Sequence, residues 1–165
     1  MIKLKVLGAG HEVGRSGFLA SYKDSNVLFD YGFKLNPAAI EYPIMPTEKI
    51  QSVVLSHAHL DHSGMIPALF QKSKPWLYTT APTLDLSNIL WQDTLKIAEH
   101  EGTDAPFTQE DIKTANKRSQ ILSYKQEAKI APNVHISMYD AGHILGSAMT
   151  KITFAGSIFL TILAI

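Results

Sequence analysis

The chain has 165 residues, the length of a single domain, and 45% of them are hydrophobic, which is enough to bury a core. Fifteen Lys and Arg residues balance fifteen Asp and Glu residues, so no global field attracts nucleic acid or an anionic membrane. The chain has no cysteine, which excludes disulfides and thiolate metal sites and is typical of a reducing, cytoplasmic setting. Residues 1–10 lack the apolar core of a signal peptide, and no membrane association is expected.

Short strands and helical segments alternate along the chain. In chain order, the hydrophobic patterns predict strands at residues 2–7, 18–22, 26–29 and 50–55, a helical segment at 65–70, a strand at 76–79, a helix at 83–100, a capped helix start at 108–111, strands at 134–139 and 148–154, and a buried strand from 158. This alternation predicts a layered α/β fold.

A cluster of potential metal ligands, His57-Ala58-His59-Leu60-Asp61-His62, follows the apolar strand at 50–55. In an extended segment His57 and His59 point the same way, and the following turn can direct Asp61 and His62 elsewhere. That arrangement could serve two neighbouring metal ions, and imidazole and carboxylate are ligands that zinc accepts when cysteine is absent. The alternative is a surface histidine cluster, but four ligand residues between a buried strand and a helix favour the metal site.

The motif resembles the HxHxDH signature of the metallo-β-lactamase superfamily. Within that superfamily the chain is most similar to the β-CASP nucleases: ribonuclease J, the nuclease subunit of the cleavage and polyadenylation specificity factor, and their archaeal relatives. Five further stretches carry the resemblance, which runs from about residue 3 to 154: residues 14–16, 28–32, 63–67, 79–83 and 141–148 (AGHILGSA). It implies the N-terminal half of an αββα sandwich, with a mixed sheet and flanking helices.

The resemblance also implies two zinc ions. It assigns His57, His59 and His143 to one ion, and Asp61 and His62 to the other. Asp30 takes the position of a carboxylate that orients the histidine loop, and Asp61 becomes the candidate for steering the proton of a metal-bound hydroxide, so both are candidate catalytic residues. From the residues alone, Asp30 could equally end a strand in a turn with Tyr31 and Gly32, and His143 could be a turn residue.

The end of the chain departs from the family pattern. Members continue into a segment resembling YTGD, whose aspartate bridges the metals, and then into a β-CASP domain, whereas no carboxylate follows Asp140 here. Residues 1–165 are therefore interpreted as a truncated metallo-β-lactamase domain that binds zero to two zinc ions and is expected to be inactive, with little or no turnover. One set of codons for residues 161–165 encodes Tyr-Thr-Gly-Asp when read in another frame, so we hypothesise a frameshift, with an engineered fragment as the rival explanation; the coding DNA decides between them. The truncation predicts an uncovered sheet edge, an apolar surface and self-association.

Three functions are compatible with these features. The first is a metal-dependent phosphodiesterase that cleaves RNA. The second is a non-catalytic folded remnant or interaction module. The third is another metallo-β-lactamase hydrolase acting on thioesters or lactams, against which the stretches at 79–83 and 141–148 argue. His11 and Glu12 could line the cleft or be exposed loop residues, and exposure is favoured. His100 and His135 are expected to have no functional partner.

Overall fold

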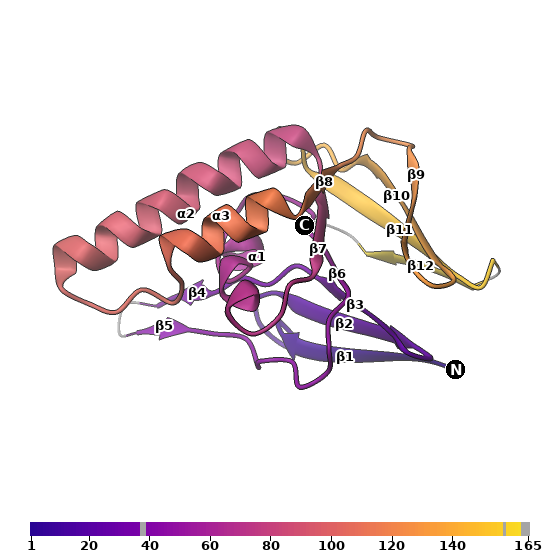
Figure 1. The fold of residues 1–165 in the computed structure, drawn as a ribbon, viewed down its shortest axis with the longest axis horizontal. Helices are drawn as coiled ribbons and strands as arrows, with labels where there is room; N and C mark the ends of the chain where they lie inside the picture. The colour runs from indigo at the N-terminus through magenta and orange to yellow at the C-terminus, as the bar shows by residue number, and fades with distance from the viewer. Residues whose placement is uncertain (37–38, 157, 163–165) are drawn as a thin grey trace.

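The computed structural model describes residues 1–36, 39–156 and 158–162, with side chains described up to residue 156. Two β-sheets lie face to face, and a layer of helices covers the outer face of the larger sheet (Figure 1). This mixed α/β architecture confirms the predicted fold class.

The larger sheet has the strand order β1-β2-β3-β6-β7-β8. Strands β1 to β3 are antiparallel, whereas β3, β6, β7 and β8 run parallel to one another. The strands are β1 (Ile2–Gly8), β2 (Gly17–Tyr22), β3 (Ser25–Phe29), β6 (Ser52–Val54), β7 (Trp76–Thr79) and β8 (Ser119–Ile121). A separate small hairpin pairs β4 (Lys34–Leu35) with β5 (Ile40–Glu41). Parallel pairing places the carboxyl ends of β3 and β6 at one edge of the sheet.

The smaller sheet is antiparallel, with the order β12-β11-β10-β9. Its strands are β9 (Glu127–Ala131), β10 (Val134–Asp140), β11 (Ala148–Phe154) and β12 (Ile158–Ile162). Alternate residues of β10 and β11, such as Ile136 and Ile152, pack against Val27 and Phe29 of the larger sheet. The predicted terminal strand is confirmed as β12, which pairs with β11.

The helices pack on the other face of the larger sheet. They are α1 (Leu60–Ser63), the 3-10 helix η1 (Pro67–Gln71), α2 (Ala81–Glu101) and α3 (Gln109–Lys117). Trp91 of α2, Ile112 of α3 and Phe70 of η1 share one core with Leu28 and Val53 of the sheet. No helix within the described part of the chain combines the length and apolar character that a membrane span requires.

Local signals explain where the long helices begin and end. The Thr80 side chain accepts a hydrogen bond from the Thr83 backbone and caps α2, which ends at Gly102 in a left-handed conformation with φ of 65°. Helix α3 begins with a capping box between Thr108 and Asp111, as its sequence predicts. The segment predicted as helical at 65–70 is instead a 3-10 turn that starts at Pro67.

The outer face of the smaller sheet differs from the expectation of an exposed apolar surface. Its half-buried side chains on β10 and β11 are mostly polar: His135, Ser137, Tyr139, Met149, Lys151 and Thr153. The prediction of an apolar face is therefore wrong for these two strands, because their apolar residues alternate onto the inner face. Self-association through a sheet edge stays a prediction.

Candidate metal centre

The histidine motif lies at the carboxyl edge of the parallel strands. Asp30 follows β3 and His57 follows β6, and the two strands pair in parallel. The Asp30 backbone N–H donates to the Val54 carbonyl oxygen over 3.0 Å, which holds the two strand ends together. Open α/β sheets present their ligand sites at this edge, so topology alone brings Asp30 to the motif.

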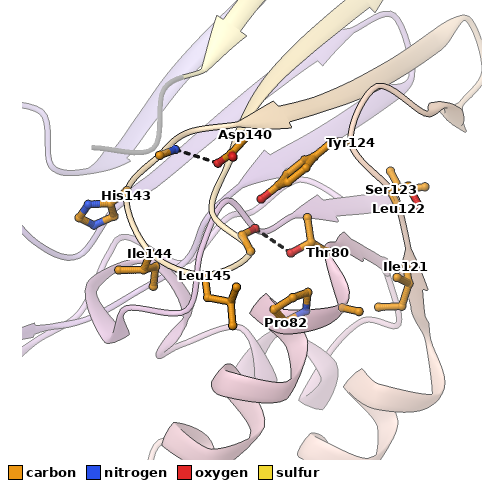
Figure 2. Close-up of a pocket in the computed structure, with 13 residues that line it drawn as sticks. Thr80, Pro82, Ile121, Leu122, Ser123, Tyr124, Asp140, His143, Ile144 and Leu145 are labelled. Atoms are coloured by element: carbon orange, nitrogen blue, oxygen red, sulfur yellow. Dashed lines mark hydrogen bonds between the residues drawn. The ribbon is translucent and has the colours of Figure 1, made fainter.

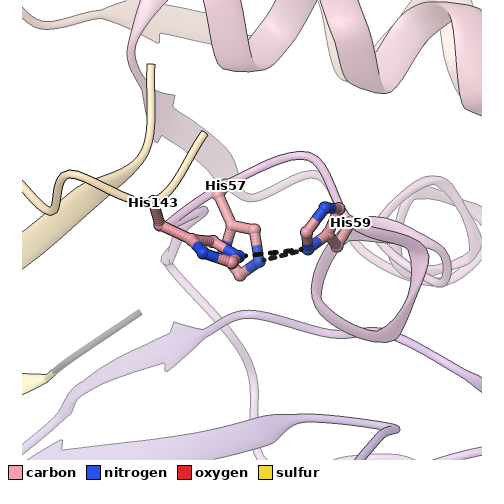
Figure 3. Close-up of side chains that lie close together, drawn as sticks. All are labelled: His57, His59 and His143. Carbon is pink, nitrogen blue, oxygen red and sulfur yellow. Dashed lines mark hydrogen bonds between the residues drawn. The ribbon is translucent and has the colours of Figure 1, made fainter. Parts of the chain in front are cut away.

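Three histidine side chains converge at this edge (Figure 3). His57 Nε2 lies 3.1 Å from His59 Nδ1, and His143 Nε2 lies 3.3 Å from the same atom. The ligand atoms of the three residues all fall within 4.8 Å of one another. Two nitrogens bound to one tetrahedral zinc at about 2.0–2.1 Å lie roughly 3.3 Å apart, so the donor set and its spacing fit a metal ion.

His143 reaches this cluster from the other sheet, on the loop between β10 and β11. The hydroxyls of Thr80 and Thr83 donate to the Gly146 carbonyl oxygen over 2.7 and 2.9 Å. Gly146 has a φ of 82°, and an added Cβ would lie 2.7 Å from the Thr80 hydroxyl, so this position requires glycine. The start of α2 therefore anchors the His143 loop, which gives the stretch at 79–83 a role that sequence reasoning did not find.

Beneath the cluster, Asp30 accepts three hydrogen bonds and is 2% exposed. Its Oδ1 accepts from the Ser56 backbone over 2.7 Å. Its Oδ2 lies 2.7 Å from the Ser56 hydroxyl and 2.8 Å from His62 Nδ1. Both carboxylate oxygens of Asp30 are therefore engaged, by Ser56 and His62.

The environments of His57 and His62 differ in their effect on protonation. Burial lowers the pKa of His57 to about 4, with a further contribution from neighbouring His62, so the ring is neutral at pH 7. Burial also opposes protonation of His62, but its hydrogen bond to Asp30 and the charges of Asp30 and Asp61 outweigh it, and the pKa of His62 is raised. A neutral His57 is the form that a metal ion requires.

Asp61 and His62 form a second, smaller pair beside the cluster. Asp61 Oδ2 lies 3.6 Å from His62 Nε2, and the Asp61 side chain is 34% exposed. The Ser16 hydroxyl is 3.5 Å from the same His62 nitrogen. The His62 ring also lies next to that of His57, with ring centroids 4.1 Å apart, so this pair adjoins the group formed by His57, His59 and His143.

The backbone of Asp61 and His62 is held by the residues just before β2 and just after β3. Tyr31 N–H donates to the His62 carbonyl oxygen over 2.7 Å, and Ser16 N–H donates to the Asp61 carbonyl oxygen over 2.8 Å. An added Cβ at Gly32 would lie 1.9 Å from the Asp61 carbonyl carbon. The motif therefore rests directly on the Gly32 backbone, and only glycine leaves room for this approach.

A pocket of about 670 Å³ opens beside His143 (Figure 2). Its wall includes Pro82 at the start of α2, Ile121 at the end of β8, Tyr124 of the segment that follows, and Leu145 of the His143 loop. The Tyr124 hydroxyl donates to the Ser147 carbonyl oxygen over 2.9 Å, so the ring is fixed in place. A largely apolar pocket that borders the histidine cluster is suited to part of a substrate.

The remaining residues singled out from the sequence lie elsewhere. His11 is exposed as expected, but Glu12 is half-buried and pairs with Arg15 and, over 2.9 Å, with Lys34. The Lys34 and Arg15 contacts hold the pKa of Glu12 below its usual value. His100 is exposed, and His135, expected to lack a partner, lies 3.4 Å from Glu127.

Comparison with known proteins agrees with this geometry. Residues 19–160 match the metallo-beta-lactamase superfamily domain, and the chain belongs to that superfamily. Its relatives include proteins named "Transcription termination factor FttA". The chain is 36% identical to that of Lokiarchaeum sp. and 37% identical to that of Methanocaldococcus jannaschii, over 93% and 92% of its own length. It spans about a quarter of the length of these curated relatives, 25% in each case.

Solved structures share the fold at low sequence identity. A metallo-beta-lactamase from Cronobacter sakazakii, mutated in its HARLDQ motif, has a TM-score of 0.64 at 19% identity and covers 96% of this chain and 59% of its own. A protein of unknown function from Enterococcus faecalis has a TM-score of 0.61 at 18% identity, covering 98% of this chain and 43% of its own. The predicted resemblance to the superfamily is confirmed, and the histidine cluster is the group that could hold its metal.

Proposed function

We propose that this chain is the metal-binding part of a zinc-dependent phosphodiesterase of the β-CASP type that cleaves RNA. The observation that carries the proposal is the convergence of His57 Nε2, His59 Nδ1 and His143 Nε2 at spacings of 3.1 and 3.3 Å. RNA as the substrate class is supported by the relatives named transcription termination factors, to which the chain is 36% and 37% identical.

Each site residue has a part in this proposal. His57, His59 and His143 hold one zinc ion, and Asp61 with His62 contributes to a second. Bound zinc supplies a nucleophilic hydroxide at neutral pH and stabilises charge on the phosphoryl group. Asp61, partly exposed beside the cluster, accepts a proton at its carboxylate, while Asp30 fixes the direction of His62.

Substrate placement is assigned to the pocket beside His143. Its volume of about 670 Å³ leaves room for a nucleotide, and Tyr124, Pro82 and Leu145 offer apolar contacts to a base. Bases stack on aromatic side chains without strict sequence preference. A single strand of RNA lying in this pocket would place a phosphate near the three histidines.

The rate of RNA cleavage depends on how well the second metal position is built. Within the described residues the second pair comprises only Asp61 and His62, and a two-ligand site binds metal weakly. We therefore predict that the chain binds one zinc firmly and cleaves RNA slowly. A chain that bound zinc but left RNA intact would act as a metal-binding or interaction module.

The test compares RNA cleavage and zinc binding by the same preparations. The 165-residue chain, His59→Ala and the exposed control His100→Ala are incubated with zinc and an end-labelled single-stranded RNA. Slow cleavage by the chain and by His100→Ala, absent in His59→Ala and with chelator, supports the proposal. Cleavage that survives His59→Ala refutes the assigned site, and failure to bind zinc refutes the metal centre itself.

A further inference from the structure

Ser56 links a carboxylate to a histidine of the cluster. It is the last residue before the motif, is 5% exposed, and lies between Asp30 and His57. Its hydroxyl oxygen is 2.7 Å from Asp30 Oδ2 and 3.0 Å from His57 Nδ1. No role was assigned to this side chain from the sequence.

The direction of each hydrogen bond follows from the number of available protons. The Asp30 carboxylate can only accept, so the Ser56 hydroxyl gives its single proton to Asp30. The same oxygen then has only lone pairs to offer His57. His57 Nδ1 must therefore carry a proton and donate it to Ser56, which leaves a lone pair on His57 Nε2, the atom that faces His59.

We propose that Ser56 is a positioning residue that holds His57 in the Nδ1–H tautomer and so directs its Nε2 lone pair into the three-histidine centre. Asp30 acts on two of the three histidines of the motif: directly on His62 Nδ1 over 2.8 Å, and on His57 through the Ser56 hydroxyl. Carboxylates that orient metal-ligating histidines raise metal affinity in this way. The metal-binding part of the inference rests on the proposed function, whereas the tautomer belongs to the metal-free chain.

The hydroxyl is not needed to attach the loop. The Ser56 backbone N–H independently donates to Asp30 Oδ1 over 2.7 Å, and the Ser56 carbonyl oxygen accepts from Ala148 N–H over 2.9 Å. Ser56→Ala retains both contacts and removes only the hydroxyl, with its bonds to Asp30 Oδ2 and His57 Nδ1. Ser63, at the end of α1, offers a matched control, because it is also a buried serine next to the motif but its hydroxyl donates to the Ala58 carbonyl oxygen over 2.7 Å.

The experiment uses the full 165-residue chain, Ser56→Ala and Ser63→Ala. Long-range ¹H–¹⁵N correlation spectra of the metal-free proteins at neutral pH identify the tautomer of His57. Zinc affinity is then measured by competition with a chelating dye. We expect the Nδ1–H form in the chain and in Ser63→Ala, its loss in Ser56→Ala, and a 10- to 100-fold weaker affinity for zinc in Ser56→Ala, the usual effect of removing such a partner.

Each outcome decides the inference. An Nε2–H tautomer of His57 in the unsubstituted chain overturns it, whether or not the variants fold. An unchanged tautomer and unchanged zinc affinity in Ser56→Ala also overturn it. If the tautomer depends on Ser56 and zinc binds, but RNA is not cleaved, the positioning role stands and the proposed function fails.

Discussion

Gly32→Ala tests whether the metal motif depends on the close approach of two backbone segments. The added Cβ would lie 1.9 Å from the Asp61 carbonyl carbon, 2.0 Å from its oxygen and 2.4 Å from His62 N. Carbon atoms in contact are separated by roughly 3.5 Å, so one segment must move by about 1.5 Å. The atoms in the way are main-chain atoms, which cannot rotate aside as a side chain can.

The loss of stability expected for Gly32→Ala follows from the packing and the hydrogen bonds that this movement disrupts. Overpacking in a closely packed region costs about 1–3 kcal/mol. The shift also breaks the bonds from Tyr31 N–H to the His62 carbonyl and from Gly32 N–H to the Ser16 carbonyl, each costing about 1 kcal/mol or more when buried. We expect Gly32→Ala to lower the free energy of unfolding by about 3 kcal/mol or more and to weaken zinc binding.

Urea denaturation in the presence of chelator measures the first effect, and dye competition measures the second. Gly102→Ala is the control, because Gly102 has a φ of 65° but no atom within 4 Å of an added Cβ. Its cost is conformational strain of about 1 kcal/mol, without loss of zinc affinity. If Gly32→Ala were as stable as Gly102→Ala and bound zinc equally well, the close approach would not support the motif.

Three further predictions concern stability. Trp91→Phe removes the bond from Trp91 Nε1 to the Ser63 carbonyl over 3.0 Å in a fully buried site, and should lower the free energy of unfolding by about 2–3 kcal/mol in urea titrations, with an unchanged value counting against this anchor. Asp111→Ala breaks the capping box with Thr108 and should lower the free energy of unfolding by about 1 kcal/mol in the same titration. Lys113 is exposed, and Lys113→Ala should leave that free energy unchanged. Zinc at 100 times its dissociation constant should raise the free energy of unfolding by about 2.7 kcal/mol. A melting temperature that is the same with zinc and with chelator would argue against binding to the folded state.

Much of the fold could be predicted because its strands carry regular patterns. The alternation in residues 134–139 and 148–154 predicted β10 and β11 with correct starting residues, and helical spacing predicted most of α2. Strands β8 and β9 were missed. β8 reads Ser-Gln-Ile, which is short and polar, and it is a strand because it pairs in parallel with β7. Such pairing is a tertiary effect without a local signal.

Among the site residues too, those with a local sequence signal were predicted from it, and those that depend on tertiary packing carry no such signal. His57 to His62 were predicted from ligand type and spacing, which are local properties. His143 lies 84 residues from His59 in sequence and reaches it through the packing of the two sheets, so only the resemblance to a known family indicated it. Ser56, Thr80 and Thr83 carry common hydroxyls whose importance depends on partners far away in the chain, and no local pattern distinguishes them.

The most direct test of the central claim is the zinc content of the metal-loaded chain after gel filtration, compared with His143→Ala and the exposed control His100→Ala. We expect one firmly bound zinc in the chain and in His100→Ala, and its loss from a folded His143→Ala, because the cluster needs a ligand from each sheet. Equal zinc content in His143→Ala would contradict a centre shared between the two sheets.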